Sequence, residues 1–229
     1  MIVTGYRGET KPKMYILVGG KGSRLETVTA GNIPKSLIDT GQKPFLVYVL
    51  DMLGSKFDVT LVCSKANVNY FKKFKKEWVF KPMEILNEGK ASGTAGWLRK
   101  FYRRLPESFY VMNGDTFYAG DMDLHTYEST IFVKEDVIEG DEGYVEGWGG
   151  LVLRMVEKNP DAIGEKKKVN HGIYKFYKKD LPLPFDRKEQ LSMEYDILPN
   201  MNLRYKVVNS TKYDIGTVER LERFEKWFR

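Results

Sequence analysis

The stretch MYILVGGKGSRL, residues 14–25, decides how this chain can fold, because an apolar run leads straight into a loop with three glycines. Glycines let the backbone approach a ligand closely and point successive N–H groups at it. Arg24 can bind phosphate oxygens through two N–H groups, and Lys35 adds a second cation. The loop is neither a P-loop nor a dinucleotide fingerprint, because the spacing fails for both. The stretch therefore predicts a strand and a polyphosphate-binding loop, with a plain tight turn as the alternative.

The first half of the chain alternates between strand and helix patterns. Strands are predicted over Met14–Val18, Val59–Cys63, Met83–Leu86 and Phe109–Met112, and helices over Phe45–Leu53, Val68–Lys76 and Thr94–Leu105. Pro44 precedes the first of these helices, at a position typical of a helix start. Such alternation is typical of a parallel sheet covered by helices on both faces.

The second half contains more strand patterns. Strands are predicted over Thr130–Val133, Gly150–Val156, Val169–Tyr177 and Tyr205–Val208, and helices over Met193–Leu198 and Val218–Phe228. The segment Gly140–Gly150 is rich in glycine and acid and predicts a turn or mobile loop. Because no repeat or linker is visible, we expect one domain over residues 14–229, after a loosely ordered extension over residues 1–13.

The composition indicates a globular protein that handles anions. The chain has 229 residues, 42% of them hydrophobic and 30% charged, and a formal charge of +6. A positive balance suits nucleic acid, a membrane surface or anionic small molecules, but the lysine clusters are more typical of solvated faces. The single cysteine, Cys63, lies in an apolar run and is compatible with a reducing compartment. With no segment long enough for a membrane span, we expect a cytoplasmic protein that binds neither membrane nor nucleic acid.

Two carboxylates are candidates for metal binding. Asp115 directly follows the predicted strand that ends at Met112, and ligands of open α/β sheets bind beyond the carboxyl ends of the strands. Asp214 precedes the last predicted helix, where Thr217 can serve as the cap and leave Asp214 free. A carboxylate beside a polyphosphate is suited to hold Mg²⁺. The alternative for Asp115 is a simple Asn-Gly-Asp turn.

Three further motifs are weak evidence for a binding site when each is considered alone. Residues 92–96, Ser-Gly-Thr-Ala-Gly, open a predicted helix with small residues that allow close approach of a flat ring or an anion. Glu157 and Lys158 end a strand, and Lys158 can bind a phosphate or be merely exposed. His171 lies between Asn170 and Gly172 and, without an identifiable partner, fits a packing group better than a catalytic base.

Taken in order, seven motifs make the chain resemble the sugar-1-phosphate nucleotidyltransferases. They are Gly19–Leu25, Pro34-Lys35, Gly93–Gly96, Asn113–Asp115, Glu157-Lys158, Asn170–Tyr174 and Asp214–Thr217. The resemblance extends from Met14 to the C-terminus and is strongest to the short heptose-1-phosphate guanylyltransferase and mannose-1-phosphate nucleotidyltransferase branches. It implies an α/β, three-layer Rossmann-like (GT-A-like) fold with a mixed central sheet and a β-rich second half.

The resemblance also implies roles for individual residues. Arg24 and Lys35 would be the catalytic cations, and Asp115 and Asp214 would hold Mg²⁺. The nucleoside triphosphate would be bound by Gly19, Gly20, Gly22, Ser23, Glu88, Gly93, Thr94 and Asp115. The sugar phosphate would be bound by Glu157, Lys158, Asn170, His171 and Gly172. His171 and Asn159 depart from the family pattern, as does Ser23, where threonine is usual.

The implied reaction transfers a nucleoside monophosphate from a nucleoside triphosphate to a sugar 1-phosphate and releases pyrophosphate. GTP with mannose or heptose 1-phosphate is favoured, and a homo-oligomer is possible. Three alternatives stay open. One is a cytidylyltransferase for phosphocholine, with Tyr144 and Trp148 in an aromatic cage. The others are a glycosyltransferase that uses Asp121 and Asp123, and a non-catalytic nucleotide-sugar-binding protein.

Overall fold

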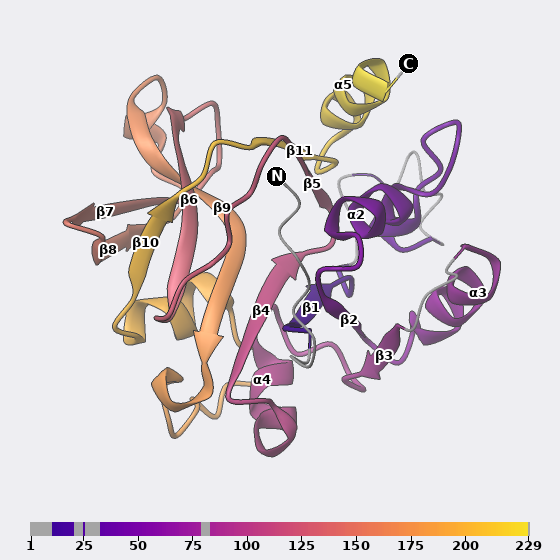
Figure 1. Ribbon diagram of the computed structural model, residues 1–229, viewed down its shortest axis with the longest axis horizontal. Coiled ribbons are helices and arrows are strands. Elements are labelled where there is room, and N and C mark those ends of the chain that lie inside the picture. Colours follow the sequence, from indigo (N-terminus) through magenta and orange to yellow (C-terminus); the bar gives the residue numbers. More distant parts are fainter. Residues whose placement is uncertain (1–10, 21–24, 26–32, 79–82, 229) are drawn as a thin grey trace, which may run out of the picture.

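A mixed nine-stranded sheet forms the centre of the protein (Figure 1). The computed structural model describes residues 11–20, 25, 33–78 and 83–228. In spatial order the strands are β3 (Glu84–Asn87), β2 (Asp58–Cys63), β1 (Lys13–Leu17), β4 (Ser108–Asn113), β9 (Lys166–Tyr177), β6 (Thr130–Val137), β10 (Arg204–Val207), β8 (Leu151–Val156) and β7 (Tyr144–Trp148). The first four strands are mutually parallel, whereas β9 runs antiparallel to both β4 and β6.

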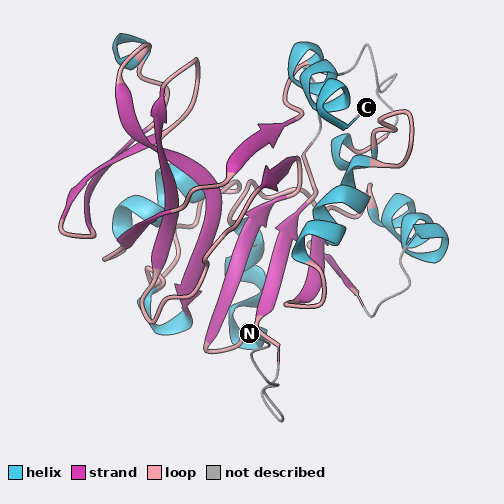
Figure 2. Ribbon diagram, turned by 45° about the horizontal axis from the view of Figure 1, so that its top comes forward, coloured by secondary structure: helices cyan, strands magenta, loops and turns pink. Residues whose placement is uncertain are grey.

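Helices cover both faces of the parallel part of the sheet, which gives three layers (Figure 2). The α-helices are α2 (Phe45–Leu53), α3 (Val68–Trp78), α4 (Gly96–Phe101) and α5 (Val218–Phe228). Side chains alternate along β1, so that Met14 and Ile16 enter the core under α2, α3 and α5, and Tyr15 enters the core under α4. The expected α/β fold with a mixed sheet is confirmed.

Short helical segments complete the second half and flank the main helices. They are the 3₁₀ turns Lys35–Leu37, Tyr102–Arg104, Pro160–Ala162, Lys178–Asp180 and Leu198–Asn200, and a π-helical turn over Met193–Ile197. The predicted helix over Thr94–Leu105 is therefore α-helical only within α4, and the predicted Met193–Leu198 helix is a π turn that passes into a 3₁₀ turn. The predicted helices Phe45–Leu53 and Val218–Phe228 are confirmed to the residue.

The prediction of a turn or mobile loop over Gly140–Gly150 is wrong for its second part. This part contains β7, which pairs with β8 and, at Tyr144 and Val145, with β9. Both of these side chains are buried. Gly147 fits the strand because a Cβ there would collide with the carbonyl oxygen of Leu151. Gly147 thus marks a point where two backbone segments come close together, and not a turn.

A second, two-stranded sheet was not predicted from the sequence. It consists of β5 (Thr116–Ala119) and β11 (Thr211–Asp214), which run antiparallel with Asp214 opposite Thr116. The Ile215 N–H donates to the carbonyl oxygen of Asp115 at 3.0 Å. This pairing brings the segments that carry Asp115 and Asp214 side by side (Figure 1).

The chain enters the sheet earlier than predicted. Lys13 is the first residue of β1 and forms ion pairs with Asp58 (3.0 Å) and Glu84 (2.8 Å), and the Pro12 carbonyl accepts from the Asp58 N–H. Among the described residues, no helix has the length and apolar character needed to cross a membrane.

Candidate active site

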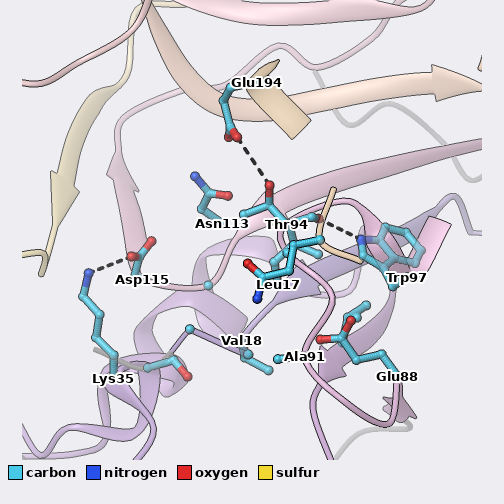
Figure 3. A pocket seen from close by; sticks show the side chains of 17 residues that line it. Leu17, Val18, Lys35, Glu88, Ala91, Thr94, Trp97, Asn113, Asp115 and Glu194 are labelled. Carbon is cyan, nitrogen blue, oxygen red and sulfur yellow. Dashed lines mark hydrogen bonds and ion pairs between the residues drawn. The ribbon is translucent and has the colours of Figure 1, made fainter. Parts of the chain in front are cut away.

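A cavity of about 490 Å³ opens at the carboxyl ends of β1, β2 and β4 (Figure 3). Its wall combines backbone from Leu17–Gly20 with side chains from distant segments, among them Lys35, Glu88, Thr94, Asn113, Asp115 and Glu194. Gly114 makes this convergence possible, because a Cβ there would lie 2.6 Å from Val18 Cγ1 and 2.8 Å from the Leu17 carbonyl oxygen. The cavity therefore lies where ligands of open α/β sheets bind.

Glu88 forms the end of the cavity next to Gly19. A Cβ on Gly19 would lie 3.4 Å from Glu88 Oε1, so backbone and carboxylate are neighbours. Glu88 Oε2 accepts a hydrogen bond of 2.6 Å from Ser92 Oγ, and burial raises the pKa of Glu88 above its ordinary value. Gly20 also lines the cavity. Lys21, Gly22, Ser23 and Arg24, to which the sequence assigned phosphate binding, lie outside the described residues.

The Gly93–Thr94 segment is fixed against the chain nearly a hundred residues away. Gly93 has a φ of +83°, and a Cβ there would collide with the Leu191 carbonyl oxygen, so only glycine fits. Thr94 Oγ1 accepts from the Met193 N–H at 2.7 Å and donates to Glu194 Oε2 at 3.3 Å. These bonds connect the start of the α4 segment to the π turn.

Lys35 and Asp115 are paired at the opposite end of the cavity. Lys35 Nζ lies 2.7 Å from Asp115 Oδ2, and 37% of the Asp115 side chain stays exposed. Burial alone would raise the pKa of Asp115, but the Lys35 ammonium outweighs this effect and holds the pKa below its ordinary value. Asp115 is therefore an ionised carboxylate beside a cation.

Asp214 is held by a different cation. Arg220 Nη1 lies 3.0 Å and 3.2 Å from its two carboxylate oxygens, and the Gly216 N–H donates to Oδ1 at 2.9 Å. A Cβ on Gly216 would lie 3.7 Å from Lys35 Nζ, which shows that the two ion pairs are close to each other.

The two carboxylates suit a divalent cation by their chemistry. Both are hard oxygen donors on adjacent segments, and Mg²⁺ is typically bound by one or two carboxylates, with phosphate oxygens and water as its other ligands. Within the described ranges no three Asp, Glu, His or Cys side chains gather as a metal site. Asp115 and Asp214 therefore stay the two candidate ligands that the sequence indicated.

The residues assigned to the sugar phosphate come from β9 and from the end of β8. Asn170 Oδ1 accepts a hydrogen bond from the Gly172 N–H at 2.8 Å. Gly172 has a φ of +72°, and a Cβ at this position would lie only 2.7 Å from Asn113 Nδ2. Glu157 Oε1 is buried and has no hydrogen-bond partner among the described groups. Burial, aided by the charge of Glu194, raises the pKa of Glu157 to about 7. Lys158 is exposed with a left-handed φ of 53°.

His171 does not contact the main cavity. Its ring is 2% exposed, lies 4.9 Å from the Tyr118 ring, and places Nε2 3.1 Å from Ser210 Oγ. Burial, together with Lys212, lowers the pKa of His171 to about 3, so the ring is neutral. The structure thus places His171 away from the main cavity, in the wall of a second cavity of about 290 Å³ that Asp214 also lines.

Sequence reasoning did not identify Glu194 as a site residue. It lies in the predicted Met193–Leu198 helix, but its approach to Thr94 depends on the tertiary fold. Asp121 and Asp123 do not line the cavity, and Asp123 instead pairs with Lys206 at 2.7 Å.

Comparison with known proteins identifies the family. Residues 13–226 match the family model described as nucleotidyl transferase, and the chain belongs to this family.

Relatives of different lengths match the chain. A D-glycero-alpha-D-manno-heptose 1-phosphate guanylyltransferase of Campylobacter jejuni is 28% identical over 89% of this chain and 94% of its own length. Mannose-1-phosphate guanyltransferase beta-B of Xenopus laevis is 31% identical over 82% of this chain and 56% of its own length. The chain spans 40% of the bifunctional protein GlmU of Methanocaldococcus jannaschii.

Solved structures agree in fold. HddC from Yersinia pseudotuberculosis superposes with a TM-score of 0.75 at 25% identity, covering 95% of this chain and all of that one. The CTP:phosphocholine cytidylyltransferase LicC from Streptococcus pneumoniae has a TM-score of 0.73 at 18% identity, which supports the fold alone.

Proposed function

We propose that this chain transfers a nucleoside monophosphate from a nucleoside triphosphate to a sugar 1-phosphate and releases pyrophosphate. The Lys35–Asp115 pair carries the proposal, because it sets a cation and an ionised carboxylate in the wall of the cavity at the strand ends. The family membership of the chain supports the same reaction class.

The chemistry needs electrostatic help more than proton transfer. An oxygen of the sugar 1-phosphate attacks the α-phosphorus, the bond to the β-phosphate oxygen breaks, and pyrophosphate leaves. The attacking oxygen is already anionic, so no general base is required. In our proposal Lys35 and Arg24 bind the triphosphate and Lys158 binds the sugar phosphate, which offsets the repulsion between the two anions. Mg²⁺ held by Asp115 and Asp214 would neutralise phosphate charge when bound.

Glu88 supports guanine as the base. It is a carboxylate at the end of the cavity remote from Lys35, it is 7% exposed, and Ser92 donates to it. An ionised carboxylate can only accept hydrogen bonds. Guanine presents two adjacent donors on its Watson–Crick edge, N1–H and N2–H, which match two carboxylate oxygens. We therefore propose GTP as the donor, with mannose or heptose 1-phosphate as the acceptor.

The phosphocholine alternative receives no support from β7. Tyr144 and Trp148 are four residues apart on this strand, a separation of about 13 Å at the usual rise per residue. Tyr144 is 4% exposed and Trp148 is 82% exposed, so the two rings do not enclose one ammonium group.

The test is pyrophosphate release from ATP, CTP, GTP and UTP, each with a panel of sugar 1-phosphates and with phosphocholine. We expect turnover with GTP and a manno-configured sugar 1-phosphate. Glu88→Gln should weaken the preference for GTP, because an amide offers only one acceptor oxygen. Glu84→Gln is the matched control, because Glu84 is an exposed glutamate on β3, the strand that ends just before Glu88. Absence of pyrophosphate release with every sugar 1-phosphate would overturn the proposal.

A further inference from the structure

Glu194 places a carboxylate in the cavity wall at a point for which the proposed reaction has no assigned group. It belongs to the π turn Met193–Ile197 and lies in the cavity wall beside Thr94 (Figure 3). The other carboxylates in this wall are Glu88, next to Gly19, and Asp115, paired with Lys35.

The two oxygens of Glu194 have different surroundings. Ser192 Oγ and Thr94 Oγ1 both donate to Oε2, at 2.8 Å and 3.3 Å. The hydroxyl of Ser192 in turn accepts from the N–H groups of Glu194 and Tyr195, and that of Thr94 accepts from the Met193 N–H. The carboxylate is thus held in place through Oε2. In the described part of the chain no group donates to Oε1.

Glu157 presents a second acceptor without a donor. Its Oε1 is buried and unpartnered among the described residues. Glu157 and Glu194 both lie close enough to the Tyr174 hydroxyl to raise its pKa, but Glu157 is not among the described residues that line the main cavity. Burial and the Glu194 charge, which raise the pKa of Glu157, are consistent with this proximity.

The charge of Glu194 determines what can bind it. A phosphate group would be repelled by a carboxylate and is attracted to the Lys35 end of the cavity. A neutral hydroxyl, in contrast, donates a charge-assisted hydrogen bond to a carboxylate oxygen. A carboxylate oxygen in the cavity wall that receives no hydrogen bond from the described residues therefore matches a ligand that carries hydroxyl groups.

We propose that Glu194 determines sugar specificity by accepting a hydrogen bond from a ring hydroxyl of the sugar 1-phosphate. This inference rests on the proposed function. The ribose of the nucleotide is the competing source of hydroxyls, and the experiment separates the two.

The test compares Glu194→Gln with wild type on the sugar 1-phosphate that is turned over best, on its monodeoxy analogues, and on GTP against 2′-deoxy-GTP and 3′-deoxy-GTP. In the variant, Ser192 and Thr94 keep the amide oxygen on their side, so the NH₂ group faces the cavity and cannot accept. We expect the KM for the sugar 1-phosphate to rise roughly 10- to 100-fold, with a smaller change in kcat. Discrimination against one deoxy analogue should largely disappear, and the preference for GTP over its deoxy analogues should stay unchanged.

Glu189→Gln is the matched control, because Glu189 lies in the same segment, pairs with Lys90 at the surface and does not line the cavity. An equal loss on the parent sugar and on every deoxy analogue would assign Glu194 a merely structural role and overturn the inference. A changed preference between GTP and its deoxy analogues would assign it to the ribose. If Glu194→Gln fails to fold by circular dichroism, Glu194→Asp should still reduce the same discrimination. If the wild-type protein turns over no pair of nucleoside triphosphate and sugar 1-phosphate, the proposed function itself is overturned. If the wild type is active and Glu194→Gln has the same KM and the same discrimination between sugars, only this inference is overturned.

Discussion

Lys35 Nζ lies 2.7 Å from Asp115 Oδ2, although the two residues are 80 positions apart. Lys35 begins a 3₁₀ turn after Pro34, and Asp115 follows β4. Their pairing keeps Asp115 ionised and leaves both charges at the cavity wall. In the proposed reaction each charge would gain a stronger partner, Lys35 a phosphate and Asp115 a metal ion.

Asp115→Asn should lower kcat/KM by about a hundredfold or more, because the amide neither carries the charge nor binds Mg²⁺ well. Asp123→Asn is the control, since Asp123 pairs with Lys206 away from the cavity. Steady-state pyrophosphate release measures both variants. Near-normal turnover of Asp115→Asn in Mg²⁺ would contradict the metal assignment.

Lys158→Ala and Lys158→Gly should both raise the KM for the sugar 1-phosphate, since both lose the cation. They should differ in stability, because Lys158 has a left-handed φ of 53° that costs a non-glycine residue about 1–2 kcal/mol. The glycine variant is thus expected to unfold at the higher temperature in a thermal melt. An effect confined to the KM for GTP would reassign Lys158 to the nucleotide.

Glu157→Gln should increase stability at alkaline pH relative to wild type. The raised pKa of about 7, against an ordinary 4.5, means that the native state binds more protons than the unfolded state between these values. The stability of the wild type therefore falls as pH rises from about 4.5 to 7, and the variant lacks this loss. Urea unfolding at pH 5 and pH 8 measures the difference. Parallel pH profiles for the two proteins would refute the prediction.

His171 should make the protein less stable in acid. Its pKa is lowered to about 3, so between this value and 6.5 the unfolded chain binds more protons than the native one. Stability falls as pH drops through this range, by at most about 1.4 kcal/mol per pH unit. His171→Gln should flatten this part of the profile without changing the ranking of sugar 1-phosphates, whereas the exposed His125→Gln should leave the profile as it is. A changed sugar ranking in His171→Gln would return the ring to the substrate site.

The sequence predicted elements best where one periodicity ran unbroken. In α2, apolar residues at helical spacing follow Pro44 and end before Gly54, and the boundaries were predicted to the residue. It failed at β7, because Gly147 indicated a turn when its real reason is the neighbouring Leu151 carbonyl. The pattern of apolar and polar residues along one segment contains no information about which other backbone segment will pack against it.

The sequence could identify those residues of the candidate site that directly follow a predicted strand or belong to a recognisable motif. Asp115 and Gly19 follow buried strands, and parallel strands bring such ends together. Glu194 was missed because its position depends on Thr94, a hundred residues earlier. The ring of His171 was assigned to the sugar by its place in a motif, but its burial beside Tyr118 and Ser210 is set by β9 and the segment before β11.

The pairing of β5 with β11 has a consequence for how the protein is made. Asp115 emerges from the ribosome about a hundred residues before Asp214, and the sheet that joins their segments cannot close until β11 has been synthesised. Long-range strand pairing of this kind is slow and late in folding. A nascent chain would thus complete the parallel part of its sheet before the segments that carry Asp115 and Asp214 are joined, and these segments would come together only after β11 has been synthesised.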